Sequence, residues 1–145
     1  MTMNKNIEFL LQTYANQVPF YKLLGFTLDS FDAENVCIRF PWREEFLGNP
    51  LTKLMHGGVI SAILDTVGGF VLHVHYASCP MFSEKLARIS TIDLHVDYLL
   101  PGRGCQFIAS GNILRIGKKV AVIRTELQNE EQKLIAAATG KYIVG

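Results

Sequence analysis

The chain has 145 residues, of which 49% are hydrophobic and 19% charged, and its 14 Lys and Arg residues nearly balance its 13 Asp and Glu residues. This length and composition are typical of one globular domain and exclude a disordered chain. The formal net charge of +1 gives no general reason to expect nucleic acid or an anionic membrane as a partner. We therefore expect a single domain over residues 1–145, on which any site for a polyanion is local.

The cysteines Cys37, Cys79 and Cys105 are far apart in the sequence and have no CxxC spacing. This usage fits a reducing compartment better than a disulfide framework or a zinc site. The first residues contain no apolar segment followed by a cleavage site, so we expect a cytoplasmic protein rather than a secreted one. The histidines show no ligand pattern with supporting cysteines or carboxylates, and we expect neither a metal nor another cofactor.

The amino-terminal segment, residues 1–25, is predicted to be helical. Apolar residues recur at helical spacing from about residue 4 to residue 16. Pro19 suits the first turn of a second, shorter helix, and Gly25 suits its end. We expect both helices to dock on the body of the domain through their apolar faces.

A hairpin and a long helix are expected next. The strand candidates are residues 26–31 and 36–40, and turn-forming residues separate them. An irregular segment with proline and glycine then leads to His56-Gly57-Gly58, where a helix is expected to begin and to continue to about Tyr76.

This helix is predicted to be apolar on nearly every side, because Asp65 is the only strongly polar residue between Val59 and Leu72. Helices of this kind are buried. Burial of an unpaired carboxylate is costly, so Asp65 is expected to have partners or to serve a site. The helix approaches the length of a membrane span, but the charge of Asp65 and the glycines within it argue against insertion.

The carboxyl half is predicted to be an antiparallel meander with strands over about residues 91–98, 106–116, 120–127 and 134–144. Strict alternation divides the first of these strands into two faces, one with Ile92, Leu94, Val96 and Tyr98 and the other with Thr91, Asp93, His95 and Asp97. A sheet wrapped around the apolar helix would hide it from water on most sides. The expected fold class is therefore α+β.

The order of these elements, the His56-Gly57-Gly58 turn, Asp65, and the run IDLHVDYLLPGRG over residues 92–104 resemble the hotdog-fold thioesterases of the PaaI-like group. Within that group, GKKVAV at 117–122, NEEQ at 129–132 and the ending YIVG are similar to the YigI-type acyl-CoA thioesterases. The resemblance covers nearly the whole chain.

The resemblance implies an antiparallel sheet of five to six strands wrapped around a long central helix. It also implies hydrolysis of medium- to long-chain acyl-CoA to free fatty acid and coenzyme A, without a metal, and a place in fatty acid metabolism. Homodimers that share their active sites and pair into tetramers are the implied assembly.

Gly57 and Gly58 at a helix start leave backbone N–H groups unobstructed, and the positive end of the helix dipole adds to their field. Such a place stabilises the negative charge that develops on the carbonyl oxygen in thioester hydrolysis. Gly57 is the expected oxyanion donor, and Gly58 is expected to contact the substrate. The alternative interpretation is that the two glycines only allow a tight entry to the helix.

Asp65 is expected to attack, either as general base on a water or as a nucleophile that forms a mixed anhydride. The alternative is a structural acid that accepts hydrogen bonds from hydroxyl groups or backbone. Eight residues separate Gly57 from Asp65, which is about 12 Å of helical rise. One carbonyl must lie about 3 Å from both groups, so we expect two chains to share each site in an obligate homodimer.

Other residues are expected to support the site. The resemblance places Thr91 where a Ser or Thr helps to orient the water, and Asn49 where relatives have an asparagine, although the segment after Asn49 is about one residue longer here. His56 is expected to bind the thioester or the leaving sulfur, or alternatively to cap the helix. Three cations are expected at turns, Arg103, Lys118 and Lys119. They are expected to bind the phosphates of coenzyme A, or alternatively only to protect an edge of the sheet.

Two other functions stay open. A non-catalytic acyl-CoA-binding or regulatory module can use the same fold, because fold does not imply function. A hotdog dehydratase or hydratase is the less favoured alternative, because those enzymes pair a histidine with an acid in a motif that this chain does not reproduce.

Overall fold

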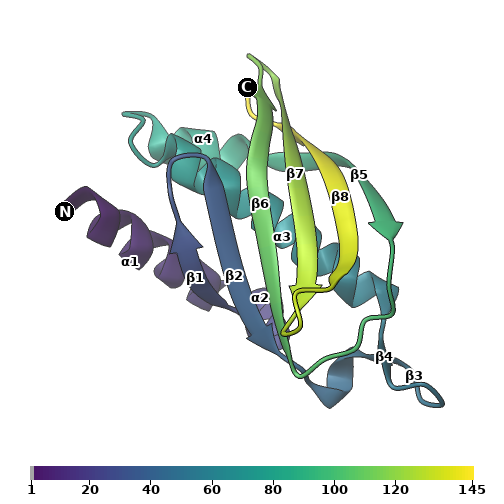
Figure 1. Cartoon of the computed structure of the whole chain (residues 1–145). Helices are drawn as coiled ribbons and strands as arrows, with labels where there is room; N and C mark the ends of the chain where they lie inside the picture. The colour runs from purple at the N-terminus through teal and green to yellow at the C-terminus, as the bar shows by residue number, and fades with distance from the viewer. Residues whose placement is uncertain (1) are drawn as a thin grey trace.

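An antiparallel sheet packs on one long helix, α3, in the computed structural model of the chain (Figure 1). The structure describes the backbone of residues 2–145 and the side chains of residue 5 and residues 7–145. The helices are α1 (Thr2–Gln17), α2 (Pro19–Leu24), α3 (Gly57–Tyr76) and α4 (Phe82–Arg88), with a 3-10 turn at Glu44–Phe46. The strands are β1 (Thr27–Phe31), β2 (Asn35–Pro41), β3 (Leu47–Asn49), β4 (Leu54–Met55), β5 (Ser90–Tyr98), β6 (Gln106–Ile116), β7 (Val120–Asn129) and β8 (Leu134–Ile143).

Within residues 2–145, six strands form the main sheet in the order β1-β2-β6-β7-β8-β5, and β3 pairs with β4 in a separate small hairpin. Each pair of neighbouring strands is antiparallel. The predicted meander is confirmed for β6, β7 and β8 but is wrong for β5, which pairs with β8 at the sheet edge and not with β6, the next strand in sequence. Figure 1 shows β1 and β5 at the two edges of the main sheet and α3 across one face. The predicted α+β class, with an antiparallel sheet wrapped around a long helix, is confirmed.

The core lies between α3 and the strands in the middle of the sheet. Ile63, Leu64 and Val67 of α3 are fully buried, and alternate residues of β2 and β7 are buried against them because successive side chains of a strand point to opposite faces. By length and composition α3 would also qualify as a membrane span, but most of it is buried inside the fold. The apolar character of α3 is thus explained by its place in the core.

The amino-terminal helices end as predicted. Pro19 begins α2, and Gly25 ends it with a left-handed backbone, φ +67°, a conformation that glycine adopts without steric cost. The guanidinium of Arg43 donates to the backbone carbonyls of Lys22 and Leu23 and so satisfies two acceptors at the helix end.

The face predicted for Thr91 is wrong. Thr91 lies opposite Tyr142 and Asp93 lies opposite Lys141, so Ile92 is an extra residue in β5 and forms a β-bulge. The bulge turns Thr91 to the α3 side of the sheet and leaves the side chain of Ile92 51% exposed. The short helix α4, which sequence periodicity did not reveal, has no buried residue and therefore no apolar stripe to detect.

Candidate active site

Asp65 lies in the third turn of α3, where two hydroxyl groups contact its carboxylate. Oγ1 of Thr91 donates to Oδ1 at 2.9 Å, and the hydroxyl of Tyr142 lies 3.2 Å both from Oδ1 and from the backbone oxygen of Asp65. Among the described residues, no donor reaches the second carboxylate oxygen, Oδ2. The carboxylate is therefore held through one oxygen, while the other is left for a ligand.

A cleft of about 350 Å³ opens beside this carboxylate, between α3 and the amino-terminal helices. Its lining includes Phe20 and Ala62 and a set of polar side chains, Tyr14, Tyr21, His73, Ser90 and Thr91. Burial, with Tyr14 and Asp65 nearby, raises the pKa of Tyr21 to about 12. Tyr21 thus stays protonated and can act as a hydrogen-bond donor inside the cleft.

His73 is a buried polar group of this cleft, with 6% of its surface exposed. Its ring packs edge-on against Tyr14 and Phe70, with ring centroids 4.9 and 5.5 Å away. Burial lowers the pKa of His73 from 6.5 to about 4, so the ring is neutral at neutral pH.

The neutral state of His73 predicts acid sensitivity. Between about pH 6.5 and pH 4 the unfolded chain binds a proton at this residue and the folded chain does not, so stability falls as the pH falls through this range. We expect about 2 to 3 kcal/mol of unfolding free energy to be lost through His73 between about pH 7 and pH 4.5. Urea unfolding of the wild type and of His73→Leu at both pH values measures it; an equal loss in both proteins would contradict the assignment.

The start of α3 has one capped and one uncapped N–H group. The N–H of Gly58 donates to Nδ1 of His56 at 2.8 Å, which makes His56 the N-cap, while the N–H of Gly57 has no acceptor among the described residues. Because Nδ1 accepts, the neutral ring of His56 carries its proton on Nε2 and can donate it outward. The capping alternative for His56 is thus observed and is compatible with contact to a ligand.

Two contacts hold the turn before Gly57 in place. The N–H of His56 donates to the carbonyl of Phe46 at 2.8 Å, and the hydroxyl of Tyr98, at the end of β5, donates to the carbonyl of Gly57 at 3.1 Å. The ring of Tyr98 also lies against Gly57, because a Cβ there would be 3.3 Å from the ring. The unpaired N–H group of Gly57 is therefore set in a fixed place on the surface.

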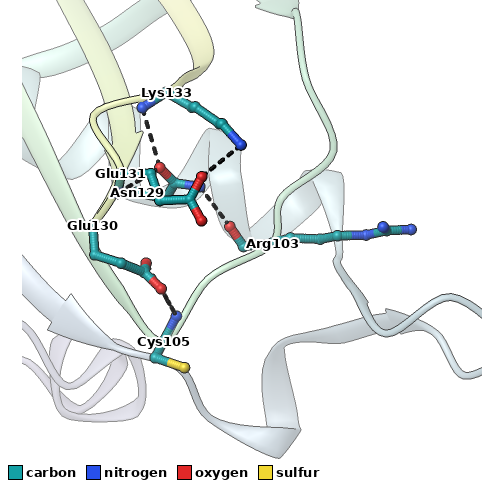
Figure 2. A network of polar contacts seen from close by, with 6 residues as sticks. All are labelled: Arg103, Cys105, Asn129, Glu130, Glu131 and Lys133. Carbon is teal, nitrogen blue, oxygen red and sulfur yellow. Dashed lines mark hydrogen bonds and ion pairs between the residues drawn. The ribbon is translucent and has the colours of Figure 1, made fainter.

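A polar network holds the loop after β5 against the turn between β7 and β8 (Figure 2). The side chain of Asn129 donates to the carbonyl of Arg103 at 2.9 Å, and the carboxylate of Glu130 accepts the N–H of Cys105 at 3.0 Å. One residue earlier in the loop, the carbonyl of Gly102 accepts the N–H of Met55. The NEEQ segment thus orders a loop that contacts the strand just before His56.

The predicted cations do not meet within one chain. Arg103 precedes β6 and Lys118 follows it, so the length of this strand, about 35 Å, separates them. Figure 2 also shows the side chain of Arg103 extending away from the Asn129 network. Lys119 lies beside Lys118 in the turn before β7. A phosphate site made by all three would need more than one chain.

Asn49 lies in the small β3–β4 hairpin, whose Gly48 packs closely on His56. Its side-chain oxygen accepts the N–H of Leu51 at 3.0 Å and so orders the turn of this hairpin. The structure gives Asn49 a structural contact near the start of α3, and its predicted contact with substrate stays a prediction.

Sequence reasoning did not single out Tyr142 or Tyr98 as site residues. Tyr142 belongs to the YIVG ending, and Tyr98 belongs to the segment 92–104; both contributed only to the resemblance. No local pattern marks either hydroxyl, because each contacts α3 from a strand distant in sequence. Among the described residues, no group of three His, Cys, Asp or Glu side chains could hold a metal ion.

Comparisons with known proteins identify the family of the chain. A family model described as thioesterase superfamily matches residues 52–136, which include the start of α3, Asp65 and Thr91. All of the chain aligns, at 39% identity, with 97% of a protein of Escherichia coli K12 named medium/long-chain acyl-CoA thioesterase YigI.

Solved structures show the same architecture. A protein of Shewanella oneidensis related to the thioesterase superfamily has a TM-score of 0.90 at 33% identity, with 99% of this chain and 98% of that chain aligned. The E. coli PaaI protein of the phenylacetic acid degradation operon has a TM-score of 0.79 at 21% identity, over 93% of this chain and 90% of its own, a likeness of fold alone.

An antiparallel sheet packed on a central helix is thus shared with proteins of the thioesterase superfamily. The chain belongs to the thioesterase superfamily. The predicted hotdog fold, the structural likeness to PaaI and the relation to YigI are confirmed.

Proposed function

We propose that this chain is an acyl-CoA thioesterase that hydrolyses medium- to long-chain acyl-CoA, as the name of its E. coli relative describes for that protein. The observation that carries the proposal is the state of α3. This helix presents an N–H at Gly57 that has no acceptor within the described part of the chain, and a carboxylate at Asp65 that is held through one oxygen. These are the two groups that thioester hydrolysis needs.

In the proposed reaction, the thioester carbonyl oxygen accepts a hydrogen bond from the N–H of Gly57. The carboxylate of Asp65 removes a proton from a water molecule, whose oxygen attacks the carbonyl carbon. The tetrahedral intermediate then expels the coenzyme A sulfur, which takes up the proton held by Asp65. The N–H at the positive end of α3 stabilises the oxyanion while the C–S bond breaks.

A second route uses the same groups. The carboxylate attacks the carbonyl carbon directly, coenzyme A thiolate leaves and takes up a proton, and water then hydrolyses the mixed anhydride. Single-turnover reactions in ¹⁸O-labelled water separate the two routes. In the general-base route ¹⁸O enters only the fatty acid, whereas water attack at the Asp65 carbonyl of an anhydride leaves ¹⁸O in that side chain.

The shared-site dimer is part of the proposal. Gly57 and Asp65 lie eight residues apart on one uninterrupted helix, about 12 Å along its axis. The main sheet ends at β5, which pairs with β8 on one side only. Four large apolar residues of β5 and of the segment just after it are exposed, namely Ile92, Tyr98, Leu99 and Leu100. A partner chain added along β5 would cover this edge and bring a second α3 antiparallel to the first.

An apolar cavity beside the start of α3 supports the choice of an acyl substrate. It is lined mostly by apolar residues of α2 and α3, together with Glu45, Phe46 and His56, and it shares Phe20 and Ala62 with the cleft beside Asp65. The two cavities therefore adjoin along one side of α3, from His56 toward His73. We propose that the acyl chain lies along this side of the helix.

The proposal is tested by thiol release from acyl-CoA esters with about 4 to 18 carbons, detected with a thiol reagent. We expect kcat/KM to rise from short to medium and long chains, because each buried CH₂ adds about 0.8 kcal/mol of transfer free energy. Binding of acyl-CoA without thiol release from any ester would overturn the proposed thioesterase activity and favour an acyl-CoA-binding module. Hydration of unsaturated acyl-CoA in its place would favour a hydratase.

A further inference from the structure

Tyr142 of the sheet contacts Asp65 of α3. It lies in β8, only 1% of its surface is exposed, and its hydroxyl is 3.2 Å from both Oδ1 and the backbone oxygen of Asp65. The bulge at Ile92 pairs Thr91 with Tyr142 across the β5–β8 ladder. Two neighbouring strands thus direct one hydroxyl each at the same carboxylate oxygen.

The contact between Tyr142 and α3 depends on small neighbours. A Cβ added at Gly68, three residues beyond Asp65, would lie 2.2 Å from the hydroxyl oxygen of Tyr142, and one added at Gly140 would lie 2.8 Å from it. The hydroxyl therefore reaches the backbone of α3 and the carboxylate at once. A tyrosine that only filled core volume would not need its polar end at this place.

The hydroxyl of Tyr142 acts as a donor in this position. Burial, and then the negative charge of Asp65, raise its pKa well above the ordinary value of 10.0, so it keeps its proton throughout the range in which enzymes are assayed. The proton has acceptors on Asp65 alone among the described residues. With Thr91, it therefore donates to Oδ1 and holds this oxygen in place.

We propose that Tyr142 is a positioning residue for the reaction. Together with Thr91 it holds Oδ1 of Asp65, so that Oδ2 is the oxygen that removes the proton from water or attacks the carbonyl carbon. The inference rests on the thioesterase function proposed above. It assigns to Tyr142 a role in orienting the carboxylate, and not a contact with the substrate.

The expected result for Tyr142→Phe is a fall in kcat of roughly 10-fold to 100-fold with KM changed by less than about twofold, because a misplaced group affects the chemical step and not binding. The acid limb of the kcat–pH profile should move to higher pH, since a carboxylate that loses a donor is protonated more readily. Tyr76→Phe removes a hydroxyl from the far end of α3 and is the matched control.

Other titratable groups line the same cleft, namely Tyr14 of α1, Tyr21 of α2 and His73 of α3. Of these, His73 titrates in the acid range, with a pKa of about 4. The pH profile is therefore also measured in the His73→Leu background. A shift caused by Tyr142→Phe persists in that background, whereas a shift that disappears there belongs to His73 and overturns the inference.

A double-mutant cycle with Thr91→Val supplies the second test. Both hydroxyl groups act on one oxygen, so we expect the double variant to lose less activity than the product of the two single losses. If Tyr142→Phe does not fold, 3-fluorotyrosine at position 142 replaces it. The fluorinated hydroxyl is a stronger donor of nearly the same size and should move the acid limb to lower pH.

Three outcomes would overturn the inference. The first is a kcat of Tyr142→Phe equal to that of the wild type. The second is a lower kcat of Tyr142→Phe together with a lower melting temperature but an unchanged acid limb of the kcat–pH profile, and the third is a double variant whose loss of activity equals the product of the two single losses. The proposed function fails in a different way, because then the wild type itself releases no thiol from any acyl-CoA. The two failures are therefore distinguishable.

Discussion

Asp65→Asn is expected to lower the rate of thiol release by about 10²-fold to 10⁴-fold, the range over which a positioned general base contributes. The amide oxygen of asparagine can still accept hydrogen bonds from Thr91 and Tyr142, so the fold and much of the substrate binding should survive. What the variant lacks is an oxygen that can remove a proton or attack the carbonyl.

Asp29→Asn is the matched control for this prediction. Asp29 is a surface carboxylate that pairs with Arg39 at 3.1 Å, on the hairpin of β1 and β2. This variant should keep wild-type turnover. Stopped assays with purified proteins measure the turnover of each variant, and calorimetry measures its binding of acyl-CoA. Full turnover in Asp65→Asn would show that Asp65 takes no part in the reaction and would favour its interpretation as a structural acid.

Gly57→Pro is the second prediction with a large effect. Proline removes the N–H that is expected to bind the oxyanion, and loss of one such donor lowers kcat by about 10²-fold to 10³-fold. The site suits proline, because Gly57 is the first residue of α3 and His56 before it has φ −62° and ψ 134°, as a residue before proline prefers. Among the described residues, the N–H it removes has no acceptor.

Gly57→Ala is the matched control, because it keeps the N–H and adds a methyl group 3.3 Å from the ring of Tyr98, which has room to give at the surface. Its activity should stay near that of the wild type. If Gly57→Pro and Gly57→Ala were equally active, the oxyanion would be bound elsewhere, and the two glycines would only shape the entry to the helix.

The two variants together test the shared site. When inactive Gly57→Pro and Asp65→Asn chains are mixed, unfolded and refolded, heterodimers have one site with both defects and one intact site. Random pairing then restores about a quarter of the wild-type activity. If sedimentation shows that heterodimers have formed but no activity returns, both groups of each site lie in one chain. Full activity in a monomer would lead to the same conclusion.

Much of the fold could be predicted locally. Asp65 stood out because it was the only charged residue in a long apolar stretch, and the alternation of apolar residues in the carboxyl half marked its four strands, although it did not show that β5 pairs with β8. The turn at His56-Gly57-Gly58 marked the start of the helix. Each of these signals is a property of a few neighbouring residues, so a sequence displays it directly.

The partners of Asp65 could not be predicted in this way. Period-two alternation put Thr91 on the wrong face, because a single extra residue at Ile92 reverses the faces on one side of a bulge. The family resemblance, not the periodicity, pointed to Thr91. Tyr142 is 77 residues away from Asp65, and no local pattern shows that β8 directs its hydroxyl at the helix.

By itself the sequence determined the central element of this protein, an apolar helix that starts at His56-Gly57-Gly58 and carries one carboxylate. It also determined the spacing of Gly57 and Asp65, since rise per residue in a helix is constant. Only the tertiary structure decided which oxygen of Asp65 is held and that His56 caps the helix. Those features depend on strand register and on contacts between distant segments, which local propensity does not encode.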